Sequence, residues 1–181
     1  MQIKTERLLL RPFEEADAAN LYKYAKDPEV GPAAGWPPHG SVEESRNIIR
    51  LVLSGPESYA ICKKEDGRVI GAIALSLNGD SRLAEEEDEC ELGYWIGKPF
   101  WGQGLIPEAA KALLRRAFTE LGMQRVWCGY YEGNEKSKRV QEKLGFRHEK
   151  TLQEVDVPLL NEVSTEHVSL LSREAWLQKN M

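Results

Sequence analysis

A glycine-rich turn between a strand-like and a helix-like segment is the part of this sequence best suited to bind an anion. Residues 91–96 have the aromatic and branched composition of a strand, and from Leu105 onward apolar residues recur at helical spacing. Gly102 and Gly104 lie between the two segments. Glycine lets a ligand approach the backbone closely, and the first N–H groups of a helix have no partner within the helix. Such a turn could hold a phosphate group at the start of the helix.

Pro107 restricts which main-chain groups could donate to a phosphate. Proline has no N–H, but it fits the first turn of a helix, where no helical hydrogen bond is lost. The donors would therefore come from residues 103–106 and from Glu108. The turn lacks the Gly-Lys-Ser/Thr ending of a Walker loop and the third glycine of a dinucleotide-binding motif. Taken alone, an ordinary strand-to-helix connection is the more common explanation of two such glycines.

Length and composition indicate a globular protein that works without metal or nucleic acid. The chain has 181 residues, which suggests one domain spanning 1–181, and its net charge of −5 argues against a nucleic-acid partner. It has no charged-then-apolar leader and no apolar run long enough to cross a bilayer, so we expect a cytoplasmic protein without a membrane partner. Its cysteines and histidines show no metal-ligand spacing. The acidic residues 85–88 are either a solvated loop, which we favour, or an attractor for a cationic substrate.

Periodicity and turn residues predict the elements that position the turn. We expect strands at residues 5–12, 58–64, 68–77, 91–96, 125–131, 146–155 and 166–171. We expect helices at residues 14–25, 41–54, 105–121, 134–144 and 173–180. Short connections between them favour an α/β fold, with a mixed sheet and helices on both faces. Trp36 lies in the Pro- and Gly-rich loop 27–40, where it could pack as a plug or line a pocket.

The order of these elements, together with three motifs, resembles the GNAT superfamily of acyl-CoA-dependent N-acetyltransferases. The first motif is Thr-Glu-Arg-Leu-Leu-Leu-Arg-Pro at 5–12. The second is Glu-Leu-Gly-Tyr-Trp-Ile at 91–96, followed by Trp-Gly-Gln-Gly-Leu-Ile-Pro-Glu-Ala at 101–109. The third runs from Asn134 to Phe146. Within the superfamily the chain looks like the RimJ/RimL-like branch of ribosomal-protein N-terminal acetyltransferases. The resemblance implies a GNAT-like fold with a mostly antiparallel sheet, acetyl-CoA as co-substrate, and a primary amine as acceptor.

The resemblance also implies roles for individual residues. In the family the glycine turn binds the pyrophosphate of acetyl-CoA through backbone N–H groups, and the preceding strand runs beside the pantetheine arm. The cofactor-binding residues implied here are Trp95, Ile96, Gly97, Gly102, Gln103, Gly104, Leu105, Ile106, Asn134, Ser137 and Arg139. Arg139 could equally belong to an ordinary basic helix surface. Trp36 and Tyr94 are the predicted substrate-binding residues. Ile106 is bulkier than the glycine or alanine usual at its position.

Glu91 is the predicted general base, because the family's base often occupies this place in the strand. A carboxylate there can take the proton of the acceptor ammonium, which is typically worth about 10²–10⁴-fold in rate. The alternative is an exposed carboxylate that continues the acidic segment 85–88. Glu89 lies on the same face of the strand and is the reserve candidate.

Ser137 is the predicted proton donor to the departing thiolate. Many family members use a tyrosine four residues before the glycine of Gly-Phe, but here that position is Gln141. Ser137 lies one helical turn away on the same face, although it could equally bond the CoA sulfur or cap the helix. Tyr130 and Tyr131 are further candidates. The missing tyrosine leaves open a non-catalytic acyl-CoA-binding sensor or scaffold, and the sequence leaves open whether the acceptor is a protein N-terminus or a small molecule and whether the protein is a monomer or a homodimer.

Overall fold

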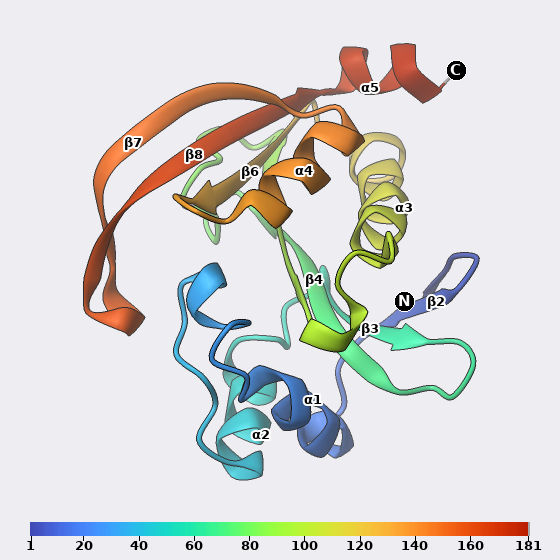
Figure 1. Ribbon diagram of the computed structural model, residues 1–181. Helices are drawn as coiled ribbons and strands as arrows, with labels where there is room; N and C mark the ends of the chain where they lie inside the picture. Colours follow the sequence, from blue (N-terminus) through green and yellow to red (C-terminus); the bar gives the residue numbers. More distant parts are fainter. Residues whose placement is uncertain (181) are drawn as a thin grey trace. The chain divides into compact units, whose positions relative to one another are not determined.

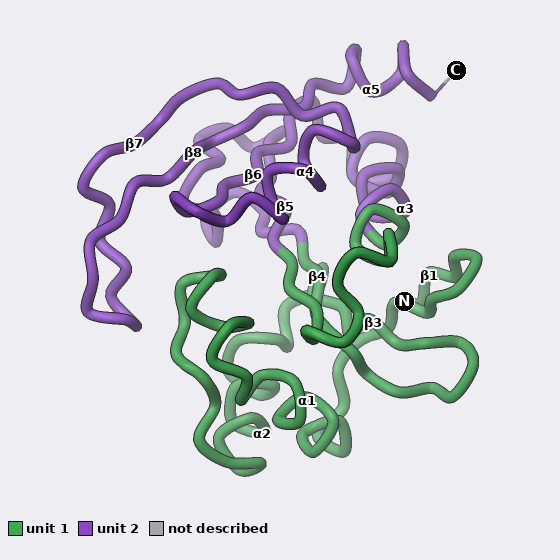
Figure 2. The backbone as a smooth tube through the Cα atoms, in the orientation of Figure 1, with its two compact units in different colours: residues 1–74, 94–109 green, residues 75–93, 110–181 purple. Residues whose placement is uncertain are grey.

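Two compact units make up the computed structural model, which describes residues 1–180 (Figures 1 and 2). The first unit holds residues 1–74 and 94–109, and the second holds residues 75–93 and the chain from Ala110 onward. The chain passes from one unit to the other within β4 (Val69–Leu77), β5 (Glu89–Ile96) and α3 (Leu105–Thr119). A single domain spanning residues 1–181 stays a prediction.

Antiparallel strands form the sheet of the first unit. β1 (Ile3–Lys4) pairs with β2 (Leu8–Arg11), β2 with β3 (Ser58–Lys63), and β3 with β4. The predicted strand 5–12 is wrong at its start, because Thr5 closes a turn between β1 and β2. The Thr5 N–H donates to the Leu8 carbonyl at 2.9 Å, and the Leu8 N–H donates to the Thr5 hydroxyl at 3.0 Å.

Two helices of the first unit share an apolar cluster. α1 (Ala18–Ala25) follows a 3₁₀ turn at Glu15–Asp17, and α2 (Val42–Leu51) begins directly after Ser41, the first residue of the predicted helix 41–54. The Ser41 hydroxyl accepts a hydrogen bond from the Glu44 N–H at 3.0 Å, which is the usual N-cap bond. The buried side chains of the cluster are Ala18, Leu21 and Ile49, with Phe13, Val42, Leu53 and Trp95 packed against them. The loop 27–40 contains a further 3₁₀ turn at Pro32–Ala34.

β6 (Arg125–Tyr131) is the strand around which the second unit is built. It pairs with residues 89–91 of β5 in parallel and with β8 (Glu162–Ser172) in antiparallel register. α4 (Glu135–Leu144) follows β6, and α5 (Arg173–Asn180) follows β8.

β7 (Arg147–Val157) and β8 form a long hairpin closed by a 3₁₀ turn at Pro158–Leu160 (Figure 1). Both strands are longer than predicted, because the ladder continues to the pair of Val157 and Glu162. β7 is exposed along most of its length, so it lacks the alternating apolar pattern that marks a strand in a sequence.

The strands are hydrogen-bonded in the order β1-β2-β3-β4-β5-β6-β8-β7. The β5–β6 pairing is parallel, and the other pairings described above are antiparallel. The predicted α/β class with a mixed, mostly antiparallel sheet is therefore confirmed. Among the helices of residues 1–180, none is long and apolar enough to cross a membrane.

Candidate active site

The turn before α3 has the backbone conformation that its glycines predict. Gly102 and Gly104 both have a φ of +73°, in the left-handed region that L-residues rarely adopt. A Cβ added to Gly102 would meet no atom within 4 Å, and one added to Gly104 would have Arg7 Nη2 as its nearest neighbour at 3.7 Å. Conformation rather than space therefore requires glycine at both positions. The open surroundings also let a ligand reach the backbone of the turn.

The main-chain donors of this turn are available to a ligand. The main-chain N–H groups of Gln103, Gly104, Leu105 and Ile106 donate to no acceptor outside α3 within residues 1–180. The side chains of Leu105 and Ile106 are buried, so the bulk of Ile106 does not cover the exposed side of the turn. The expectation that Glu108 also donates from its amide is wrong, because this N–H donates to the Gly104 carbonyl at 3.2 Å.

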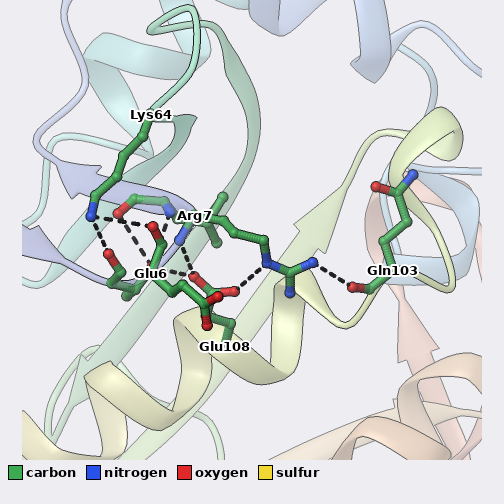
Figure 3. Close-up of polar contacts among 7 residues, drawn as sticks. Glu6, Arg7, Lys64, Gln103 and Glu108 are labelled. Atoms are coloured by element: carbon green, nitrogen blue, oxygen red, sulfur yellow. Dashed lines mark hydrogen bonds and ion pairs between the residues drawn. The ribbon is translucent and has the colours of Figure 1, made fainter.

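The Glu108 side chain, in the first turn of α3, is held by residues near the start of β2 (Figure 3). Its carboxylate accepts hydrogen bonds from the Thr5 hydroxyl at 2.5 Å and from Arg7 through both N–H and Nε at 2.7 Å. Burial opposes ionisation of Glu108, but these hydrogen bonds outweigh it and hold its pKa below the usual value. Neither Arg7 nor the Glu108 side chain was predicted as part of the site. The available signal was that both belong to family-like motifs, at 5–12 and 101–109.

The end of β5 uses part of its polar backbone within the protein. The Ile96 carbonyl accepts a hydrogen bond from the Trp101 indole N–H at 3.0 Å. The Gly97 N–H donates to the Ile70 carbonyl at 2.8 Å. The Gly97 N–H therefore has a partner within the protein and is not left to bind a pantetheine arm. Contact of Ile96 and Gly97 with that arm stays a prediction.

Trp36 packs within the first unit beside a second indole. Its ring lies edge-on to Trp95, with 5.3 Å between ring centroids, and 5.1 Å from the ring of His39. Gly31 leaves room for it, because a Cβ there would lie 2.4 Å from the Trp36 ring. These contacts favour the plug interpretation of Trp36. Substrate contacts by Trp36 and Tyr94, both partly buried, and cofactor contacts by Trp95 stay predictions.

In the second unit, Glu91 is oriented through one of its two carboxylate oxygens. Oε2 accepts hydrogen bonds from the Ser81 hydroxyl at 2.8 Å and from the Arg82 N–H at 3.3 Å. The other oxygen, Oε1, has no hydrogen-bond partner within residues 1–180. Glu91 is partly buried, so it has a fixed orientation and one oxygen able to accept a proton.

Glu89 has a different environment from Glu91. It is 3% exposed, and it accepts hydrogen bonds from Arg125 at 2.7 Å and from the Trp127 indole at 3.0 Å. Burial opposes its ionisation, but the bonds from Arg125 and Trp127 outweigh burial and lower its pKa. A carboxylate with a lowered pKa and several donors is a weak base. Glu89 is thus suited to hold β5 and β6 together rather than to take a proton from substrate.

On α4, Ser137 is hydrogen-bonded to Gln141, which stands where many family members have tyrosine. Asn134 caps the helix, since its side-chain oxygen accepts from the Ser137 N–H at 3.2 Å. Gln141 is 1% exposed, and its amide nitrogen donates both to the Ser137 hydroxyl and to the Gly129 carbonyl, at 3.3 Å each. The Gln141 side-chain oxygen is buried and has no partner within residues 1–180. Arg139 is exposed on the same helix.

The two tyrosines of β6 remain protonated donors over a wide pH range. Burial raises the pKa of Tyr130, and burial together with the nearby Glu166 raises that of Tyr131. Tyr130 stacks on His167 with ring centroids 5.0 Å apart. Within residues 1–180, no three His, Cys, Asp or Glu side chains are grouped so that they could hold a metal ion.

Comparison with known proteins gives relatives over nearly the whole chain. Residues 7–147 match the family model described as an acetyltransferase (GNAT) domain. "Uncharacterized N-acetyltransferase p20" of Bacillus licheniformis is 30% identical over 175 residues, which cover 94% of this chain and 96% of that protein. "Putative ribosomal N-acetyltransferase YdaF" of Bacillus subtilis is 40% identical over 84 residues, which cover 46% of this chain and 43% of that protein. The crystal structure of a GNAT-family acetyltransferase from Bacillus anthracis is similar with a TM-score of 0.83 at 26% identity, over 96% of this chain and 99% of that one.

Proposed function

Since this chain belongs to the GNAT family of N-acetyltransferases, we propose that it transfers the acetyl group of acetyl-CoA directly to a primary amine while both substrates are bound. The observation that carries the proposal is the turn at 102–106. Both of its glycines have a φ of +73°, and its amides lie at the start of α3 without partners outside that helix. Such donors, with the positive end of a helix dipole, suit a diphosphate. Because the chain has a net charge of −5, this attraction has to be local.

We propose that the protein belongs to the RimJ/RimL-like branch of the family. Its acceptor is either the free N-terminus of a protein or a small-molecule amine. The YdaF segment supports the ribosomal-protein branch, because that relative's name describes a ribosomal N-acetyltransferase. It matches less than half of this chain, so the acceptor has to be identified by experiment.

Glu91 serves as the general base in this proposal. Its Oε2 is held by Ser81 and by the Arg82 N–H, so Oε1 can accept the proton of the acceptor ammonium. The neutral nitrogen then attacks the thioester carbonyl carbon, so that a C–N bond forms, the C–S bond breaks, and the nitrogen releases its second proton to solvent as the amide forms. General-base assistance of this kind typically contributes about 10²–10⁴-fold in rate.

Ser137 supplies the proton for the departing sulfur and regains one from solvent. Gln141 donates to the Ser137 oxygen, so the hydroxyl proton is directed away from Gln141. A hydroxyl that accepts one hydrogen bond is also a better donor of the next. The Gln141–Ser137 pair therefore takes over the task for which many family members use tyrosine.

A panel of amines, assayed by release of the CoA thiol from acetyl-CoA, tests the proposed function. It should include short peptides with free N-terminal serine or alanine, the same peptides with blocked N-termini as matched controls, polyamines and amino sugars. We expect turnover with at least one free amine and none with its blocked counterpart. Binding of CoA without turnover on any amine would contradict the proposal and favour the sensor or scaffold.

A further inference from the structure

The guanidinium of Arg7 joins the turn to the first turn of α3 (Figure 3). Its Nη1 donates to the Gln103 main-chain carbonyl at 3.0 Å, and its Nε donates to Glu108 Oε2 at 2.7 Å. The partners lie 96 and 101 positions further along the chain, so no local preference creates these contacts. A planar guanidinium fits the task because its N–H groups form a rigid fork.

The bond to Gln103 determines where the next amide points. In a trans peptide the C=O of one residue and the N–H of the next point in opposite directions, and the described chain contains no cis peptide. Because the Gln103 carbonyl points at Arg7, the Gly104 N–H points away from the guanidinium and is left to donate to an external anion. Glycine at 104 would otherwise allow this peptide plane to rotate easily.

Arg7 also offsets a charge that would repel the anion. Glu108 is ionised and lies in the first turn of α3, close to the proposed diphosphate donors. The positive charge of Arg7 at 2.7 Å neutralises this carboxylate. The field at the start of the helix then remains favourable for phosphate.

The backbone that carries Arg7 is itself held in place. The Arg7 carbonyl accepts from the Lys64 N–H at 3.0 Å, and the Lys64 ammonium donates to the main-chain carbonyls of Thr5 and Glu6 (Figure 3). These bonds tie the segment before β2 to the residue after β3. The guanidinium thus acts from a fixed support.

We propose that Arg7 is a positioning residue for acetyl-CoA, which holds the Gln103–Gly104 peptide in the orientation that binds the diphosphate and cancels the charge of Glu108. The inference rests on the proposed function, because it presupposes that the turn binds a diphosphate.

The kinetics of wild type and Arg7→Met with two different acetyl donors test this role. Acetyl-CoA contains the diphosphate, whereas S-acetylpantetheine lacks it. We expect Arg7→Met to raise the KM for acetyl-CoA and the Kd for CoA by about tenfold. This is the change in affinity expected when one hydrogen bond to a charged group is lost. The kcat at saturating acetyl-CoA and the kcat/KM for S-acetylpantetheine should change less than about twofold.

Arg50→Met is the matched control for this experiment. Arg50 donates to Glu15 through Nε and Nη2 at 2.8 and 2.7 Å, and its side chain is 48% exposed against 46% for Arg7. It lies in the same unit but contacts neither the turn nor Glu108. We expect this variant to keep wild-type kinetics with both donors.

The outcomes separate this inference from the proposed function. A wild-type enzyme that does not prefer acetyl-CoA to S-acetylpantetheine would contradict diphosphate binding by the turn. A wild-type preference that Arg7→Met leaves intact, or a loss that is equal for both donors, would overturn the role of Arg7. If Arg7→Met does not fold, Arg7→Lys provides the same comparison, because lysine keeps the charge but cannot hold Gln103 and Glu108 with a planar fork. An unchanged KM for acetyl-CoA in Arg7→Lys would then overturn the inference.

Discussion

Replacing Glu91 by glutamine removes its ability to accept a proton while preserving its shape. The glutamine carbonyl oxygen can accept the bonds from the Ser81 hydroxyl and the Arg82 N–H, which Glu91 now receives at 2.8 and 3.3 Å. We therefore expect the free energy of unfolding to change by less than about 1 kcal/mol. An amide cannot take the proton of an ammonium group, so kcat should fall by about 10²–10⁴-fold, equivalent to about 3–5 kcal/mol of transition-state stabilisation.

The assay is thiol release over a range of pH, with saturating acetyl-CoA and the best acceptor. The wild-type rate should depend on ionisation of the carboxylate and of the amine, whereas the residual rate of Glu91→Gln should follow the amine alone. The Kd of Glu91→Gln for CoA should stay within about twofold of the wild-type value, since only the chemical step is affected.

Glu89→Gln is the control, because it makes the same substitution two residues earlier in β5. It weakens the ion pair between the buried Glu89 carboxylate and the exposed Arg125, so it should lower the melting temperature while reducing kcat less than about tenfold. An unchanged kcat and pH profile in Glu91→Gln would refute the assignment of the base. The assignment of Glu91 as the base would also be refuted if Glu89→Gln lost more kcat than Glu91→Gln, at a temperature where both variants are folded.

Three further predictions concern stability and the turn. Burial raises the pKa of Glu89, but the bonds from Arg125 and Trp127 outweigh it and hold this pKa below its usual value, so the group stabilises the fold fully above the pKa of the unfolded chain and loses its contribution as the pH falls through the folded pKa. Urea unfolding should show that the difference in unfolding free energy between wild type and Glu89→Gln becomes smaller as acid protonates Glu89, and a difference that grows on acidification would contradict the assignment. Gly104→Ala forces a side chain into a φ of +73°, so calorimetry should show about 1–2 kcal/mol of lost stability, together with a raised KM for acetyl-CoA; an unchanged melting temperature and KM would be the opposite result. Gly129→Ala places a Cβ 2.4 Å from Glu166 Oε1, which is buried and bonded to Arg82, so denaturant unfolding should show a loss of about 1–3 kcal/mol, and a change below about 0.5 kcal/mol would show that the strand shifts freely.

Local signals predicted many elements of the fold well. The strand 125–131 and the tail helix 173–180 have the bounds that the sequence predicted. Gly145 ends α4 in a left-handed conformation, with a φ of +97°. Each of these features depends on neighbouring residues, so it can be read from a short stretch of sequence.

Elements whose bounds depend on distant partners were predicted less well. The segment 5–12 reads as one strand, but the bonds between Thr5 and Leu8 make a turn of its first part. The hairpin of β7 and β8 extends through residues 156–165, which are mostly exposed and do not alternate between apolar and polar residues in the way that marks a strand. Pairing with the other strand, rather than composition, determines where such strands end.

The position of a turn suited to bind an anion could be predicted from the sequence, because Gly102, Gly104 and Pro107 influence the backbone through their own covalent structure. The sequence also made Glu91 the predicted base, with Glu89 as the reserve on the same face of the strand. The folded chain then gives the two carboxylates different surroundings, because it brings Arg125 and Trp127 to Glu89 and leaves one oxygen of Glu91 without a partner in residues 1–180. Likewise, only the fold brought Arg7 to Gln103 and Glu108. The physical reason is that backbone conformation depends on adjacent residues, whereas the charge state and orientation of a polar group depend on whichever distant residues the folded chain brings next to it.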